Sequence, residues 1–180
     1  MTQTTRLLPR KRKLQPVHED VRDLLADTPE DRFSCASEAR KKAMDFLARR
    51  EYGQRELIRK LTGKGYALSA ATKAVERLTG EGLQNDQRFA ENYIQSRVNQ
   101  GKGPVRIRVD LGQRGISEAT VDDALAEADV DWITLAREVR IKKFGQGLPV
   151  DFKAKARQMR FLQYRGFEQS DIQAAVGNAD

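Results

Sequence analysis

Apolar residues recur along most of this chain at the spacing of amphipathic helices. Ala43 and Leu47 mark one face of a helix expected over residues 37–51. A second helix is expected over residues 54–63, and a third is expected to begin near Ser69. Apolar positions three and four residues apart favour helix over strand, so the pattern predicts a unit of three short helices.

The pattern returns twice more at a period of about 50 residues, which is typical of a repeat protein. Its anchors are three tripeptides: Lys64-Gly65-Tyr66, Arg114-Gly115-Ile116 and Arg165-Gly166-Phe167. Apolar residues flank them at matched offsets, namely Leu61, Leu111 and Leu162, then Ala71, Val121 and Ile172, then Val75, Leu125 and Val176. Each glycine suits a left-handed helix end, after which the next apolar residue folds back onto the preceding leucine.

Capping residues supply further expected boundaries. Asp86 suits the N-cap of the first helix in the second unit, and Pro104 suits the first position of the next helix. A serine stands near the start of each third helix, where its hydroxyl could cap free backbone amides: Ser69, Ser117 and Ser170. The stretch Val105–Val109 alternates like a strand, but the equivalent stretches of the other units are helical in character, so we assign it to a helix.

The sequence therefore predicts an all-α fold, a tandem array of three three-helix repeats. The repeats are expected over residues 36–83, 84–129 and 130–180. Units of this size bury too little core alone, so neighbours are expected to complete each other's cores in an elongated or curved array. Residues 1–35 read as a flexible, basic and mixed-charge extension in which Val17–Ala26 could form a short helix.

The overall charge points to a polyanionic partner. The 180 residues carry a formal net charge of +7, which favours nucleic acid. An acidic membrane surface is a weaker reading, because the chain has no long apolar stretch and no lipidation signal. The basic run Arg10–Lys13 is followed by no apolar segment, so it is not a secretory signal, and we expect a cytosolic protein.

Candidate catalytic chemistry is sparse. Cys35 and His18 are the only residues of their kinds, which excludes an internal disulfide and a Cys/His zinc site. No glycine-rich phosphate loop and no paired carboxylate motif stands out. Carboxylate-based chemistry stays open on these counts, but an enzyme is the least supported class, and we expect no cofactor.

Positive charge recurs in the middle-helix stretch of every unit, whereas the third-helix segment Ser117–Asp131 is acidic and has no basic residue. Matching positions of a repeat array project onto one face, so the sequence predicts a basic stripe suited to a filament or a phosphate backbone. The hypothesised contact residues are Arg55, Arg59, Lys60 and Lys64 in the first unit, Arg97, Lys102, Arg106, Arg108 and Arg114 in the second, and Lys153, Lys155, Arg157, Arg160 and Arg165 in the third.

Aromatic residues are sparse in these basic stretches, so base stacking is not expected to be the main binding mode. Five aromatic residues at helical spacings are assigned instead to core packing: Phe89, Tyr93, Trp132, Phe152 and Phe161.

The central block carries a family resemblance. Asp86-Gln87-Arg88-Phe89-Ala90-Glu91-Asn92-Tyr93, Arg97, Gly101-Lys102-Gly103-Pro104, Arg106-Ile107, Leu111 and Gly115-Ile116 resemble the central signature of the RecX family, and the first and third units resemble its outer repeats. The resemblance implies tandem three-helix repeats, no enzymatic activity and the RecA recombinase as partner. We also expect direct contact with single- or double-stranded DNA, and a monomer. Members are thought to lie in the groove of the RecA–single-stranded-DNA filament, where they hinder its extension, ATP hydrolysis and strand exchange.

Two other functions remain open from the sequence. The protein could bind duplex DNA directly through a helix-turn-helix, although nothing marks a recognition helix. It could also be a basic helical scaffold for an acidic protein.

Overall fold

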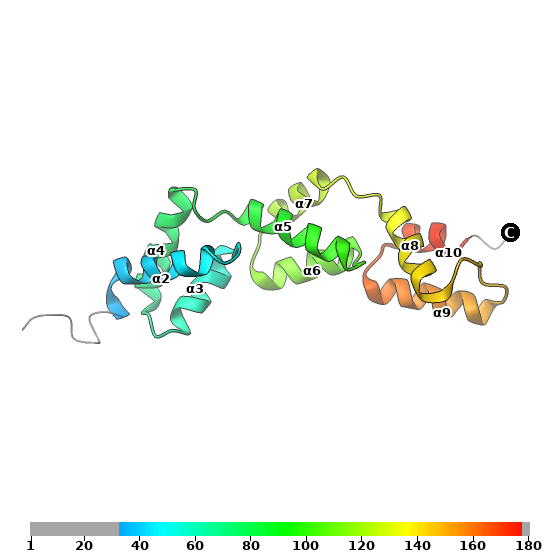
Figure 1. Cartoon of the computed structure of the whole chain (residues 1–180), viewed down its shortest axis with the longest axis horizontal. Helices are drawn as coiled ribbons and strands as arrows, with labels where there is room; N and C mark the ends of the chain where they lie inside the picture. The colour runs from blue at the N-terminus through cyan, green and yellow to red at the C-terminus, as the bar shows by residue number, and fades with distance from the viewer. Residues whose placement is uncertain (1–32, 178–180) are drawn as a thin grey trace, which may run out of the picture.

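The computed structural model describes residues 33–177, and in this range every regular element is an α-helix. Figure 1 shows three units of three helices following one another along the long axis of the molecule. The units are α2 (Ala36–Leu47), α3 (Gln54–Thr62) and α4 (Leu68–Gly80), then α5 (Asp86–Asn99), α6 (Pro104–Arg114) and α7 (Glu118–Glu127), then α8 (Trp132–Phe144), α9 (Phe152–Arg165) and α10 (Gln169–Val176). The predicted all-α tandem array is confirmed; the helix expected over Val17–Ala26 lies outside the described residues.

Each unit has its own hydrophobic core. The nine apolar residues at matched offsets from the tripeptide glycines are all buried, and they fall into three separate clusters, one in each unit. The expectation that neighbours complete each other's cores therefore holds only locally. Trp132, at the start of α8, packs against the cores of both the second and the third unit.

The three tripeptides end the middle helices in the same way. Gly65, Gly115 and Gly166 have φ angles of 97°, 87° and 87°, in the left-handed region that glycine tolerates best. The next amide donates back to the leucine carbonyl five residues earlier, with distances of 3.2 Å for Tyr66 to Leu61, 3.2 Å for Ile116 to Leu111 and 3.3 Å for Phe167 to Leu162. These are Schellman motifs, and the predicted turns are confirmed.

The serine caps were predicted correctly at one position of three. The Ser117 hydroxyl accepts from the Thr120 amide at 3.2 Å. The prediction is wrong at Ser69, because α4 begins one residue earlier, with Ala67 at its N-cap and no side-chain cap. It is wrong at Ser170, because Glu168 and Asp171 form a capping box that starts α10 without the serine.

The stretch Val105–Val109, which alternates like a strand, lies within helix α6. Pro104 occupies the first turn of α6, as predicted. Its neighbours Val105 and Val109 are about half exposed while Ile107 is buried, which explains the alternating sequence. Helix α2 ends earlier than predicted, because the chain turns after Leu47 and buries Tyr52 in the core of the first unit.

The prediction that Asp86 caps α5 is wrong by one residue. Asn85 is the N-cap, and its side chain accepts from the Arg88 amide at 3.1 Å. The Asp86 carboxylate instead accepts from the Gln54 amide at the start of α3 and from the buried Gln84 side chain, both at 2.7 Å. Asp86 therefore caps a helix of the neighbouring unit and holds the first two units together.

Replacing Asp86 with alanine is expected to lower the free energy of unfolding by about 2 kcal/mol, because two partly buried donors lose their acceptor. Urea unfolding followed by circular dichroism measures this change. Asp123→Ala is the matched control, since Asp123 is an exposed carboxylate on α7. Equal stabilities for the two variants would contradict the capping role.

Candidate filament and nucleic-acid interface

The middle helices meet end to start along the molecule. Gly166, at the end of α9, lies against the first turn of α6 at Arg106. Gly115, at the end of α6, lies against the first turn of α3 as well, but there it meets the Arg55 side chain rather than backbone. Figure 1 shows α3, α6 and α9 following one another along one edge of the array. The repeated contact therefore brings the basic stretches of the three units into one line.

Backbone hydrogen bonds fix the junction between the second and third units. The Gly103 and Val105 amides donate to the carbonyls of Arg165 and Gly166, both at 3.0 Å. The carbonyl end of one helix thus faces the amide end of the next, an arrangement that helix dipoles favour. Gly103 is glycine because any Cβ there would overlap the backbone of Gly166 and Phe167.

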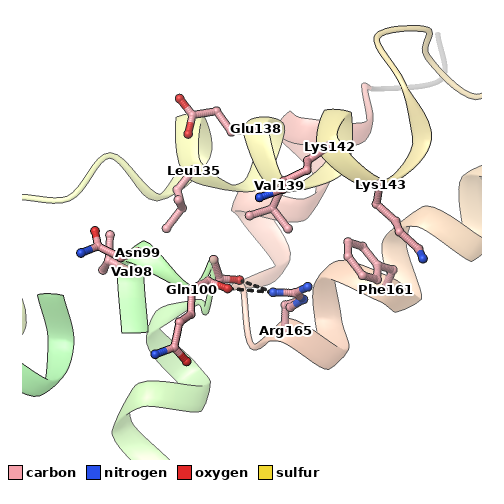
Figure 2. A pocket seen from close by; sticks show the side chains of 11 residues that line it. Val98, Asn99, Gln100, Leu135, Glu138, Val139, Lys142, Lys143, Phe161 and Arg165 are labelled. Atoms are coloured by element: carbon pink, nitrogen blue, oxygen red, sulfur yellow. Dashed lines mark hydrogen bonds between the residues drawn. The ribbon is translucent and has the colours of Figure 1, made fainter. Parts of the chain in front are cut away.

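A cleft of about 470 Å³ lies beside this junction. Figure 2 shows Arg165 reaching from α9 to the end of α5, where its guanidinium donates to the Gln100 carbonyl at 2.8 Å and the Gly101 carbonyl at 3.4 Å. Val139 and Leu135 of α8 line the opposite side. Arg165, one of the predicted contact residues, is therefore occupied in joining the two units.

All four arginines predicted in the second unit are ion-paired. Asp110 lies 3.0 Å from Arg106 and 3.9 Å from Arg97, and it accepts a hydrogen bond from Tyr93. Arg108 pairs with Asp122 on α7. The structure thus places Arg97, Arg106 and Arg114 around one pocket with Asp110, which partly neutralises their charge, whereas Arg108 lies against α7.

Arg114 is held between two units. Its guanidinium lies 2.9 Å from Glu56 on α3 and 4.9 Å from the centre of the Tyr93 ring. Burial opposes its charge, but hydrogen bonding to Tyr93 and attraction by Glu56 outweigh that cost and raise the pKa of Arg114 above its ordinary value. Arg114 is therefore primarily a junction residue.

The other predicted residues divide into two kinds. Arg55 packs its aliphatic stem on Gly115, Lys60 lies over the Phe46 and Tyr52 rings, and Arg157 lies over Phe144. The other six have side chains that make no ion pair, hydrogen bond or cation–π contact within residues 33–177, namely Arg59, Lys64, Lys102, Lys153, Lys155 and Arg160. Apart from Lys102, these six lie on or next to α3 and α9, so the uncommitted positive charge is concentrated in the outer units.

Two aromatic side chains of α9 stand out on the surface. Phe152, which was assigned to the core, is 87% exposed, and that prediction is wrong; Tyr164 is 88% exposed. Phe152 is the first residue of α9, and this helix buries no side chain before Gln158, so the exposure of Phe152 follows from its place at the helix start. The other four assigned aromatics are buried or half-buried.

Two further kinds of site, for a metal ion and for a membrane, were sought among the described residues. Between Phe33 and Gly177, no group of three or more His, Cys, Asp and Glu side chains could hold a metal ion. No helix in that range is both long and apolar enough to cross a bilayer.

Fold and surface together define a tandem three-helix-repeat protein that carries a line of basic helices. Family models for the first, second and third three-helix domains of RecX match residues 39–78, 85–125 and 129–176. The chain therefore belongs to the RecX family.

Individual relatives agree with this assignment. Regulatory protein RecX of Halorhodospira halophila is 45% identical over 147 residues, which cover 81% of this chain and 91% of the relative. Its counterpart in Pseudomonas entomophila is 43% identical over 141 residues, covering 78% and 91%.

Solved structures share the fold. A crystal structure of regulatory protein RecX superposes with a TM-score of 0.68 at 23% identity, covering 90% of this chain and 80% of that one. RecX from Lactobacillus salivarius gives 0.64 at 22% identity, covering 82% and 96%.

Proposed function

We propose that this protein is a non-enzymatic modulator, mainly an inhibitor, of the RecA recombinase. In this proposal it acts in the cytoplasm as a monomer, binds the RecA–single-stranded-DNA filament, and limits filament extension, ATP hydrolysis and strand exchange. Membership of a family of regulatory proteins supports a regulatory role. The observation that carries the proposal is the line of α3, α6 and α9, with basic side chains in every unit.

An extended line of this kind suits a long, regular polyanion better than a small ligand. Contacts with phosphates are individually modest but additive, so a row spread over three units can bind firmly. Sequence-specific reading of duplex DNA is less well supported. In the second unit, the third helix α7 carries Glu118, Asp122, Asp123 and Glu127 and no basic residue, which disfavours its entry into a DNA groove.

The direct test is single-stranded-DNA-dependent ATP hydrolysis by RecA, with this protein titrated in below the RecA concentration. Suppression at such ratios is expected, because a bound modulator acts on a filament of many RecA subunits. Hydrolysis that falls only in proportion to the DNA sequestered would identify a general DNA binder. No change in hydrolysis would favour a scaffold for another protein.

Replacing Arg106 and Arg108 together with alanine is expected to raise the concentration needed for half-suppression about tenfold, since two contacts of roughly 0.7 kcal/mol each are lost. Alanine keeps the Arg106 Cβ and backbone that contact Gly166, so helicity should be unchanged. Circular dichroism checks this, and Lys73→Ala with Arg77→Ala on α4 removes the same charge away from the line. Unchanged suppression by the Arg106/Arg108 variant would remove these residues from the interface.

A further inference from the structure

The third unit carries a groove that differs in character from the rest of the basic line. It has a volume of about 710 Å³ and lies along the outer face of α9 and the end of α8. Phe144 and Phe161 meet there edge to face, with ring centres 5.3 Å apart. Phe152 and Tyr164, both of which also line the groove, are almost fully exposed.

The charged residues of this groove all have one sign. Lys143, Lys153, Arg157 and Arg160 line it, and no acidic residue does. In the second unit, by contrast, each arginine of α6 has an acidic partner: Asp110 for Arg106, Asp122 for Arg108 and Glu56 for Arg114. The α9 groove thus combines uncompensated positive charge with aromatic rings that no neighbouring helix covers.

We propose that this groove binds single-stranded nucleic acid by stacking bases on Phe152 and Tyr164 while Lys153, Arg157 and Arg160 hold the phosphates. Exposed aromatic rings beside a positive channel are the combination with which proteins bind unpaired bases, because every base has a flat face. The two rings are twelve residues apart on one helix, about 18 Å, so they receive different bases. A duplex, whose bases are already stacked, cannot use them.

The groove continues toward the junction of the second and third units. Lys143 and Phe161 line both the groove and the neighbouring cleft, and Figure 2 shows these two side chains at the α9 side of that cleft. A strand that leaves the groove past Lys143 would therefore reach the line of middle helices. The proposal deepens the proposed function, on which it rests for its setting, by identifying where the unpaired strand is held.

The test measures binding of the full chain, without RecA, to a thymidine oligonucleotide of about 12 nucleotides and to an abasic strand of the same length and charge. Fluorescence anisotropy should show roughly 30-fold tighter binding of the base-bearing strand. The double variant Phe152→Ala, Tyr164→Ala should bind both strands equally, at the wild-type affinity for the abasic strand. Both side chains are exposed, so its thermal unfolding should match that of the wild type.

Two further variants serve as a control and as a direct probe of stacking. Leu68→Ala removes an exposed apolar side chain from the first unit and should keep the preference for bases. Phe152→Trp should keep the preference and show quenching of the new indole when the oligonucleotide binds. Equal binding of the two strands by the wild type, or an unchanged preference in the double variant, would overturn the proposal.

Other partners would give different outcomes. If the double variant loses affinity for DNA-free RecA, or for vesicles of anionic phospholipid, while its strand preference is unchanged, the groove is a docking surface and the nucleic-acid proposal is overturned. Because RecA is absent from the main assay, suppression of RecA hydrolysis without any preference for bases would refute only this inference. A preference for bases without suppression would refute only the proposed function.

Discussion

Replacing Gly103 with alanine is expected to destabilise the contact between the second and third units by about 3 kcal/mol or more. The added Cβ would overlap the carbonyl of Gly166 and the amide of Phe167. These are backbone atoms, which cannot rotate away as a side chain could. Relief requires the two units to separate, which breaks the hydrogen bonds that Gly103 and Val105 donate to the end of α9.

Because each unit has its own core, weakening the contact between the second and third units should make unfolding less cooperative. The third unit should unfold at a lower temperature than the first two, because in repeat proteins the contact between neighbours couples their unfolding. Trp132, the only tryptophan, packs on both cores and reports the separation by its fluorescence. Filament suppression should fall as well, since the line of middle helices is interrupted at that point.

Gly112 provides the control within the same helix. A Cβ added there would point into open space, and the residue lies within α6. Gly112→Ala should therefore stabilise the protein by about 0.5–1 kcal/mol, because alanine favours a helix. A Gly103→Ala protein that unfolds in one transition, at the temperature of the Gly112→Ala protein, would show that the close approach is unimportant.

Local signals explain why the sequence predicts most of the fold. A Schellman turn involves residues within one stretch of six, so Leu111, Gly115 and Ile116 suffice to predict it. The same holds for Pro104 at the start of α6. The Asp86 assignment failed where a contact across the chain decided the outcome: Asn85 and Asp86 are both good caps, and only the distant Gln54 amide distinguishes their roles.

It was harder to predict which basic side chains of the candidate interface are already paired, because that also depends on residues far apart in the sequence. The sequence shows that Arg114 is basic, but not that Glu56, 58 residues away, holds it at a unit junction. It likewise shows Phe152 at helical spacing without showing which face of α9 the core covers. Repeat matching therefore predicted where positive charge gathers, whereas the three-dimensional packing determines which charges remain available to a partner.

The largest loss of filament binding is expected when four uncommitted cations of the outer units are replaced together: Arg59→Ala, Lys64→Ala, Lys153→Ala and Arg160→Ala. None of these side chains has an ion-pair partner within residues 33–177, so a phosphate would meet their full charge. If each contact contributes about 0.7 kcal/mol, in the range of exposed ion pairs, four lost contacts weaken binding about 100-fold. Half-suppression of RecA ATP hydrolysis should shift by that factor.

Salt dependence distinguishes lost phosphate contacts from misfolding. The logarithm of affinity for single-stranded DNA should fall with the logarithm of salt concentration less steeply in this variant, by a slope of about 3, as four phosphate contacts predict. The change should be the same for a base-bearing and an abasic strand, unlike that of the Phe152/Tyr164 variant. A control that removes four cations outside the middle helices should keep nearly the wild-type slope: Lys41→Ala, Lys73→Ala, Arg77→Ala and Arg137→Ala. Equal losses in the two variants would mean that binding follows net charge alone, and the line of α3, α6 and α9 would have no special role.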